Sequence, residues 1–319
     1  MYKKQLGNTG IEVTPIGFGV LTIGGTQLNL PIEDGAEIIR YALERGINFL
    51  DTAQYYRTYS YIREALKGTS FDPVIVSKCL DSDYRGMEYA IEEARRELDR
   101  DLIDIFLLHE VRSKEDFNDR LGAWECLQEA KAKGLIRAIG VSTHHVDVAE
   151  LVAETPEADV LFPLINFKSL GIRKGQGFGT KEDMAEAIKK SADKGQGVFA
   201  MKVFGGGILT KDYRKALEYV FSLEGVHSLM IGFGSRDEVD RIIEMVEGTL
   251  DPNYTPDLSN KRIWIEQGDC EGCGRCIERC PNDALYINDI GLTYVNHDIC
   301  IRCGYCAPVC PSRAIIMIG

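Results

Sequence analysis

Positive charge is the first thing this sequence of 319 residues is short of. Its 37 Lys and Arg residues are outnumbered by 49 Asp and Glu residues, which gives a net charge of −12, and no block of basic residues occurs. Tight binding to nucleic acid or to an anionic membrane depends on clustered positive charge. We therefore expect neither nucleic acid nor membrane as a partner.

Long hydrophobic runs are also missing. The one extended charge-free stretch, residues 13–32, contains two prolines and four glycines, and a membrane helix of that composition would be poor. No apolar segment typical of a secretory peptide follows Met1. Apolar residues make up 45% of the chain and charged residues 27%, which is a globular composition. We expect a cytoplasmic protein.

Cysteine is nearly absent from the first 269 residues, where only Cys79 and Cys126 occur. Each lies in an apolar run, which predicts a buried structural thiol. The other eight cysteines form two copies of one spacing, C-x2-C-x2-C-x3-C-P. The first copy contains Cys270, Cys273, Cys276 and Cys280, and the second contains Cys300, Cys303, Cys306 and Cys310.

This doubled spacing predicts two [4Fe-4S] clusters. Three thiolates spaced in one tight turn can hold one cluster, and the fourth cysteine of that copy then ligates the other cluster. One predicted set is Cys270, Cys273, Cys276 and Cys310, and the other is Cys300, Cys303, Cys306 and Cys280. Zinc ribbons, the main alternative, use two cysteine pairs and not two triplets. Residues 269–319 resemble the bacterial two-cluster ferredoxins.

The first 250 residues alternate apolar, β-branched runs with amphipathic segments. Eight strands are predicted, at residues 15–20, 48–53, 74–79, 103–109, 136–142, 160–167, 198–204 and 228–233. A helix is expected after each, including one long helix over residues 116–133. Eight such pairs predict an α/β protein with a (β/α)8 TIM barrel. A doubly wound sheet is the alternative, but the third glycine of its phosphate turn is missing after Gly17 and Gly19.

The flanking segments complete the predicted organisation. Two short apolar runs around Gly7 and Gly10 indicate a hairpin that plugs the bottom of the barrel. Prolines and turn-forming residues without periodicity mark a linker. We predict a barrel over residues 1–248, a linker over 249–262, and a small C-terminal α+β ferredoxin-like domain over 263–319.

Four residues with useful chemistry fall at or just beyond the ends of three consecutive predicted strands. They are Asp51, Tyr56, Lys78 and His109. Catalytic groups of a (β/α)8 barrel gather at the carboxyl ends of its strands. A tyrosine, with a pKa of about 10, becomes a better proton donor when a lysine ammonium stabilises its phenolate. An aspartate would orient the lysine, and a histidine would bind the substrate oxygen.

The segments Asp51-Thr52-Ala53-x2-Tyr56, Ser77-Lys78, Leu108-His109 and Ile139-Gly140-Val141-Ser142 resemble those of the aldo-keto reductases. The resemblance implies a barrel that reduces small aldehydes and ketones with NADPH. It makes Asp51, Tyr56, Lys78 and His109 a catalytic tetrad, with Tyr56 as the general acid. By the same resemblance, the nicotinamide cofactor NADP(H) would be bound by Ser142, Asn166, Gly232, Gly234, Ser235 and Arg236.

The chain departs from the family pattern at several positions near the expected nicotinamide. Arg57 stands where most relatives have glycine, Phe162 where many have glutamine, and Met201 where many have an aromatic ring. A methionine thioether can still pack on a ring face.

The sequence is consistent with two hypotheses about function. The first is an iron–sulfur oxidoreductase of the aldo-keto reductase type, whose clusters transfer electrons to or from a redox partner protein. The second is an electron-transfer or redox-sensing protein whose barrel serves mainly as a docking scaffold. Coupling one-electron clusters to a hydride donor normally needs a flavin. No flavin motif is present, although a barrel can bind FMN without one, so a flavin stays an open alternative without support from the sequence.

Overall fold

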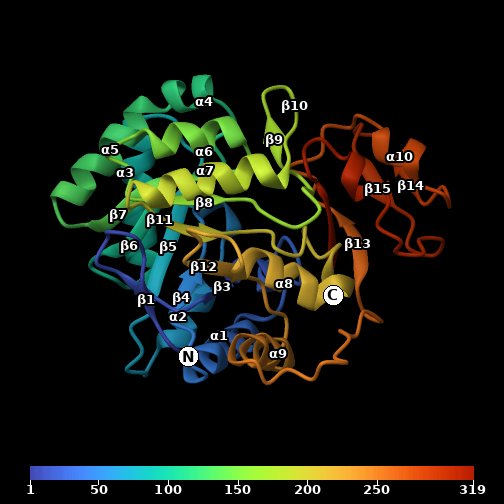
Figure 1. The fold of residues 1–319 in the computed structure, drawn as a ribbon, viewed down its shortest axis with the longest axis horizontal. Helices are drawn as coiled ribbons and strands as arrows, with labels where there is room; N and C mark the ends of the chain where they lie inside the picture. Colours follow the sequence, from blue (N-terminus) through green and yellow to red (C-terminus); the bar gives the residue numbers. More distant parts are fainter.

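The computed structural model describes all residues 1–319, and its larger part is a closed barrel of eight parallel strands (Figure 1). This confirms the predicted (β/α)8 barrel and excludes the doubly wound sheet. The strands pair in the order β11-β12-β3-β4-β5-β6-β7-β8. Their bounds are β3 Ile16–Gly19, β4 Phe49–Asp51, β5 Val74–Cys79, β6 Ile103–Leu108, β7 Ile136–Thr143, β8 Val160–Pro163, β11 Gly197–Ala200 and β12 Ser228–Ile231.

Amphipathic helices surround the barrel and bury their apolar faces against the strands. They are α1 Ile32–Glu44, α2 Tyr59–Leu66, α3 Tyr84–Leu98, α4 Lys114–Asp119, α5 Leu121–Ala132, α6 Val146–Ala153, α7 Lys181–Asp193, α8 Tyr213–Phe221 and α9 Arg236–Glu247. Cys79 at the end of β5 and Cys126 in α5 are both buried, as predicted. Every helix of the structure is too short or too polar to span a bilayer.

The single helix predicted over residues 116–133 is wrong, because α4 and α5 are separate helices that meet at Arg120. The backbone of Arg120 leaves the helical region, with φ −104° and ψ 18°. Its guanidinium donates to the Asp116 carboxylate at 2.7 Å and to the carbonyl oxygen of His109 at 2.8 Å. The pair with Asp116 is local, but helical periodicity does not encode the contact with His109, which places a cation beside that residue.

The bottom of the barrel is closed by the predicted hairpin, formed by β1 (Lys4–Gln5) and β2 (Glu12–Val13). Leu6, Ile11 and Val13 of this hairpin are fully buried and join the apolar cluster inside the barrel. The interior is therefore a packed core, and only its upper end is available for chemistry.

The C-terminal segment folds as a small α+β unit beside the barrel (Figure 1). It contains β13 Arg262–Ile265, α10 Arg275–Arg279, β14 Leu285–Ile287, β15 Thr293–Val295 and β16 Ile315–Ile318. The first and last strands, β13 and β16, pair antiparallel, as do β14 and β15. No helix or strand occurs between the end of α9 and the start of β13.

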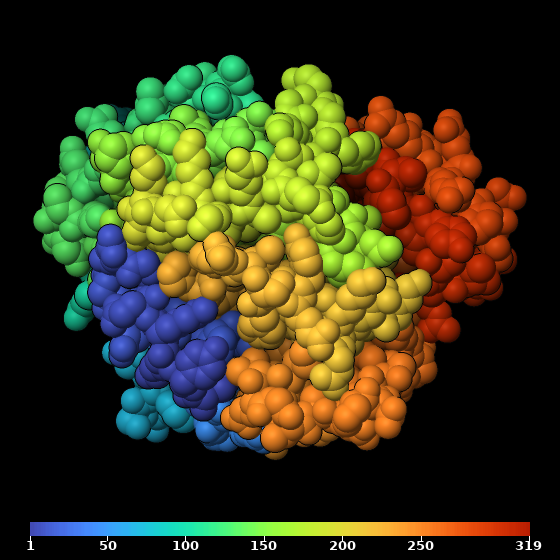
Figure 2. All heavy atoms as spheres, in the orientation of Figure 1, coloured from blue at the N-terminus to red at the C-terminus, as the bar shows by residue number.

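The small unit docks on loops at the carboxyl end of the barrel. Figure 2 shows the C-terminal residues, in red, at one side of the molecule. The Met317 amide donates to the Gly206 carbonyl at 2.7 Å. Gly207 has φ +87°, and a Cβ at this position would lie 2.2 Å from the Met317 carbonyl oxygen. Glycine is required here because the two backbones touch.

Candidate active site and cluster sites

The barrel brings together the four residues predicted to form a catalytic tetrad. Asp51 is the last residue of β4, Lys78 lies near the end of β5, and His109 directly follows β6. Tyr56 ends a short 3-10 helix, and the next residue, Arg57, has the left-handed φ of +57°. Glycine adopts this backbone conformation at a lower energetic cost than arginine does. The surrounding fold therefore stabilises the left-handed backbone of Arg57.

Lys78 and Asp51 form a buried ion pair beneath the tyrosine. The Lys78 Nζ atom donates to Asp51 Oδ1 at 2.5 Å and to the Thr52 carbonyl oxygen at 2.7 Å. The same Nζ atom lies 4.7 Å from the centroid of the Tyr56 ring. Burial lowers the pKa of Lys78 and raises the pKa of Asp51, and the attraction between the two charges opposes both shifts.

Tyr56 and His109 face each other across the mouth of the barrel. The Tyr56 hydroxyl lies 3.4 Å from His109 Nε2. The buried Nδ1 atom of His109 has no hydrogen-bond partner, which favours the tautomer with its proton on Nε2, since an unpaired donor is rarer than an unpaired acceptor. Nε2–H can then donate toward the Tyr56 oxygen and leave the tyrosine proton free to reach a ligand.

The environment sets the charge of both side chains. Burial, and then the negative charge of Asp51, raises the pKa of Tyr56 well above its ordinary value. Burial, and then the positive charges of Lys78 and Arg120, lowers the pKa of His109 well below its ordinary value. The lowering of the tyrosine pKa expected from the sequence is therefore not what this site produces. Near neutral pH, Tyr56 is a protonated phenol and His109 a neutral imidazole.

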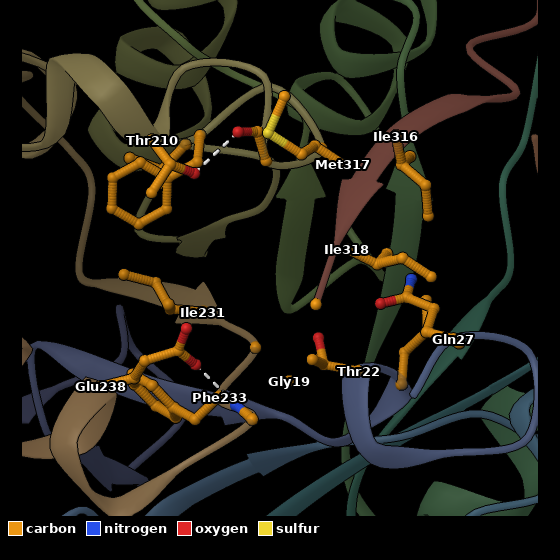
Figure 3. Close-up of a pocket in the computed structure, with 18 of the residues that line it drawn as sticks. Gly19, Thr22, Gln27, Thr210, Ile231, Phe233, Glu238, Ile316, Met317 and Ile318 are labelled. Atoms are coloured by element: carbon orange, nitrogen blue, oxygen red, sulfur yellow. Dashed lines mark hydrogen bonds between the residues drawn. The ribbon is translucent and has the colours of Figure 1, made fainter. Parts of the chain in front are cut away.

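A cavity of about 480 Å³ opens beside these residues. Its inner end is lined by Asp51, Tyr56, Phe162, Met201 and Lys202. It continues between the loops that follow β11 and β12 to the start of α9. Ile316, Met317 and Ile318 of the C-terminal strand form one wall, across from Ile231 and Glu238 (Figure 3). The volume is typical of a site for a cofactor or small ligand.

Two of the residues predicted to bind nicotinamide do not line this cavity. Ser142 is buried, and its hydroxyl accepts from the Glu110 amide at 2.8 Å. The Asn166 side chain is also buried and bridges the backbone of Leu170, with Nδ2 donating to its carbonyl and Oδ1 accepting from its amide, both at 2.9 Å. Both side chains are hydrogen-bonded to backbone groups of the protein. Each would have to give up one of these hydrogen bonds to bind a carboxamide.

The predicted phosphate loop is brought to the cavity only in part. Gly232, Gly234 and Ser235 line its outer end, whereas Arg236 does not. The Ser235 hydroxyl caps α9 by accepting from the Glu238 amide at 3.3 Å. Arg236 forms an ion pair with Glu37 and lies over the Tyr41 ring. A nucleotide can reach the backbone of this loop and the hydroxyl proton of Ser235, whereas the Arg236 guanidinium is paired with Glu37.

The cysteines of the two motifs cross between the copies in space. Cys280 lines one small cavity together with Cys300, Cys303 and Cys306. These are the four residues of one predicted set.

The other predicted set also has close members. Burial raises the pKa of Cys276, and the adjacent Cys310 and Cys273 raise it further. Cys270 lies near the same group, because its sulfur accepts from the amide of Thr293, whose hydroxyl lies 3.7 Å from the Cys276 sulfur.

The chemistry of these donors fits iron–sulfur clusters, because all eight are cysteine thiols and a cubane is held by four thiolates. Burial raises the pKa of Cys306 to about 12. Such a thiol ionises only beside a strong positive charge, which bound iron would supply.

Metal analysis tests the predicted cluster number. The anaerobically purified protein is expected to contain about eight iron and eight sulfide per chain, because two cubanes hold four of each. The measurement is colorimetric iron and acid-labile sulfide per mole of protein. Four of each, or zinc in place of iron, would contradict the two-cluster prediction.

Sequence reasoning missed several residues around the cavity. The C-terminal strand β16 and Lys261 of the predicted linker line it, although both lie outside the segment that resembles a reductase. Lys202 lines it as well, with the left-handed φ of +61°. Glu238 could have been found, because Ser235-x-x-Glu238 is the local pattern of a capping box.

Comparison with known proteins agrees with this fold. The Aldo/keto reductase family profile matches residues 15–219, and the 4Fe-4S dicluster domain profile matches residues 269–315. The chain therefore belongs to the aldo-keto reductase family, an oxidoreductase class, and carries a C-terminal 4Fe-4S dicluster domain.

Curated relatives are distant. The chain is 25% identical over 222 residues to L-galactose dehydrogenase of Arabidopsis thaliana, covering 65% of this chain and 67% of that protein. It is 28% identical over 181 residues to methylglyoxal reductase DkgA of Yersinia pestis, covering 54% and 63%. An uncharacterized oxidoreductase of Bacillus subtilis, YqkF, is 26% identical over 158 residues, and 49% of it is covered. The chain thus spans about half to two thirds of these relatives.

Solved structures support the fold. An aldo-keto reductase structure from Pseudomonas aeruginosa superposes with a TM-score of 0.67 at 24% identity, covering 78% of this chain and 96% of that one. The holo form of aldo-keto reductase AKR11C1 from Bacillus halodurans gives a TM-score of 0.65 at 21% identity, covering 79% and 92%.

Proposed function

We propose that this protein reduces a small carbonyl compound at the mouth of the barrel with a reduced nicotinamide cofactor. The observation that carries the proposal is the buried Lys78–Asp51 pair beneath Tyr56, which itself lines a ligand-sized cavity. The family resemblance predicts NADPH as the cofactor, a small aldehyde or ketone as the substrate, and Asp51, Tyr56, Lys78 and His109 as the catalytic residues.

In this proposal the side chains bind, orient and protonate the carbonyl. Met201 and Phe162 would provide an apolar floor for the cofactor, and Gly232 would offer backbone to its phosphates. A reduced nicotinamide bound there would supply the hydride that the carbonyl carbon needs. The Tyr56 hydroxyl gives its proton to the carbonyl oxygen, and His109 Nε2–H donates a hydrogen bond to the same oxygen.

Lys78 and Asp51 act through Tyr56 in this scheme. The ammonium lies against the tyrosine ring, so it stabilises the negative charge that develops as the proton leaves. Asp51 and the Thr52 carbonyl hold that ammonium in place. Asp51 also compensates for the burial of the lysine, since an unpaired buried charge costs several kcal/mol.

The C-terminal domain is proposed to hold two clusters and to exchange single electrons with a redox partner protein. Cys270, Cys273, Cys276 and Cys310 would ligate one cluster, and Cys280, Cys300, Cys303 and Cys306 the other. Eight cysteines in a doubled ferredoxin spacing, with Cys280 beside the second triplet, support this part of the proposal.

The test of the proposed reaction is anaerobic oxidation of NADH and of NADPH with a panel of small aldehydes, ketones and oxo acids. Turnover with at least one carbonyl compound, and formation of the matching alcohol, is the expected result. A protein that binds neither nucleotide and reduces no carbonyl on the panel would overturn the proposal.

The pH dependence of reduction is a separate prediction. The rate is expected to stay level from about pH 7 to about pH 9. The raised pKa of Tyr56 keeps its hydroxyl protonated throughout this range, and the lowered pKa of His109 keeps its imidazole neutral. The profile of kcat/KM against pH checks this. A decline centred near neutral pH would show that Tyr56 ionises there.

One observation favours a second function, in which the barrel is a docking scaffold for electron transfer. The side chains of Ser142 and Asn166 are bonded to local backbone and do not reach the cavity. An absorption spectrum of the anaerobic protein separates the two functions cheaply. Iron–sulfur bands that bleach with dithionite, without any effect of added nicotinamide nucleotide, would favour the scaffold.

A further inference from the structure

The outer end of the cavity, at the start of α9, already holds a carboxylate. Glu238 Oε2 accepts from the Gly234 amide at 2.6 Å, which is the dashed line at Glu238 in Figure 3. Its Oε1 atom accepts from Lys261 Nζ at 2.8 Å. The amino terminus of a helix favours an anion because its backbone amides and dipole are positive. Here a side chain of the protein supplies that anion.

The cations around this end of the cavity are paired with carboxylates. Lys261 is paired with Glu238. Arg241 Nη1 lies 2.7 Å from Glu244 Oε2. Its buried Nε lies 3.4 Å from Asp237 Oδ1 but makes no hydrogen bond. The remaining cation, Arg236, is paired with Glu37 outside the cavity.

The charges that line the cavity are therefore net negative at this end. The acidic residues that line it are Asp237, Glu238 and Asp257, and the basic ones are Arg241 and Lys261. A phosphate group placed here would have to displace existing ion pairs. It would also lie near carboxylates of like charge, which is unfavourable in a partly buried site.

NADH and NADPH differ at the 2′ position of the adenosine ribose. With the nicotinamide at the Tyr56 end, the adenosine ribose would lie toward α9, because the cavity runs from Tyr56 to the start of that helix. NADH carries a hydroxyl at the 2′ position of that ribose, which can donate a hydrogen bond to a carboxylate, whereas NADPH carries a phosphate of about two negative charges. Dinucleotide sites use an acidic residue for the first and a free cation for the second.

We propose that Glu238 selects NADH over NADPH as the cofactor of this protein. The selection combines hydrogen bonding of the carboxylate to the ribose hydroxyl with repulsion of the 2′-phosphate. The inference rests on the proposed nicotinamide-dependent reduction, and it departs from the NADPH that the family resemblance predicts.

Anaerobic titration calorimetry on the full-length, cluster-containing protein tests the inference without any turnover. NADH is expected to bind about tenfold or more tightly than NADPH, since one charge contact of this kind is worth about 1.4 kcal/mol or more. Glu238→Gln keeps the size of the side chain and removes its charge. It is expected to reduce the ratio of the two affinities to near one, mainly by tightening NADPH binding.

Glu247→Gln is the matched control, because it removes the same charge from the exposed far end of the same helix. It is expected to leave the ratio unchanged. Each ratio is taken within one protein, so partial unfolding of a variant cancels. Tighter binding of NADPH by the unaltered protein, or a ratio that Glu238→Gln does not change, would overturn the inference and leave the proposed reaction standing. Binding of neither nucleotide would overturn both.

Discussion

Replacing Tyr56 with phenylalanine is expected to lower the rate of carbonyl reduction by roughly 10²–10⁴-fold, because the change removes the proton donor and keeps the ring. The ring also covers the Lys78 ammonium, at 4.7 Å from its centroid, so the variant should retain the packing of the site. Nucleotide affinity should change little. The measurement is kcat/KM for a carbonyl substrate that the unaltered protein reduces, together with the Kd of the nucleotide.

Tyr55→Phe provides the matched control for this experiment. Tyr55 precedes Tyr56 in the chain, is mostly exposed, and does not line the cavity. The same loss of one hydroxyl is therefore expected to leave reduction nearly unchanged. Full turnover by Tyr56→Phe would show that another group donates the proton, and a loss of nucleotide affinity in that variant would indicate a binding role instead.

Replacing Cys280 with serine is expected to remove or severely alter the cluster held by Cys300, Cys303 and Cys306, and to spare the cluster of its own sequence copy. The physical reason is that Cys280 shares a cavity with the second triplet. The matching change in the other copy, Cys310→Ser, should damage the cluster held by Cys270, Cys273 and Cys276. Low-temperature EPR of the reduced variants, with iron content per chain, distinguishes the two clusters.

Cys126→Ser is a suitable control for both cysteine variants, because Cys126 is buried in α5 and belongs to neither motif. Its spectrum and iron content should match those of the unaltered protein. If Cys280→Ser and Cys310→Ser gave the same spectrum, the crossed assignment of ligands would be contradicted.

The contact between the barrel and the C-terminal unit affects how the Tyr56 and cysteine variants should be compared. The C-terminal strand β16 forms a wall of the same cavity that Tyr56 lines. It is bound to the barrel through the amide of Met317 and the carbonyl of Gly206. Loss of a cluster can therefore change nucleotide binding through packing alone, so cluster variants should be compared by nucleotide affinity as well as by rate.

Much of this architecture could be predicted from the sequence because its determinants are local. The spacing of Cys270, Cys273 and Cys276 is a property of one turn, and it indicates a cluster without knowledge of the rest of the chain. The eight strands are visible as short apolar runs, and a parallel barrel gathers their carboxyl ends by topology. For that reason Asp51, Lys78 and His109 could be assigned to one site before their distances were known.

The remaining features depend on contacts between distant parts of the chain. The sequence identifies Ser142 and Asn166 as candidate residues for nicotinamide binding. Only the folded structure shows that their side chains are hydrogen-bonded to backbone groups. Likewise, burial and the surrounding carboxylates raise the pKa of Tyr56. These carboxylates come from distant segments of the chain, so the sequence alone does not show that they lie near Tyr56.

The sequence by itself determined the barrel, the ferredoxin spacing and the identities of the four residues at the barrel mouth, since each follows from a short-range pattern. Only the tertiary structure placed β16 over the cavity and paired Glu238 with both Gly234 and Lys261. The physical reason is that ion pairs and backbone contacts between remote segments form only when folding brings those segments together. Periodicity and residue spacing describe short stretches of the chain and do not predict such contacts.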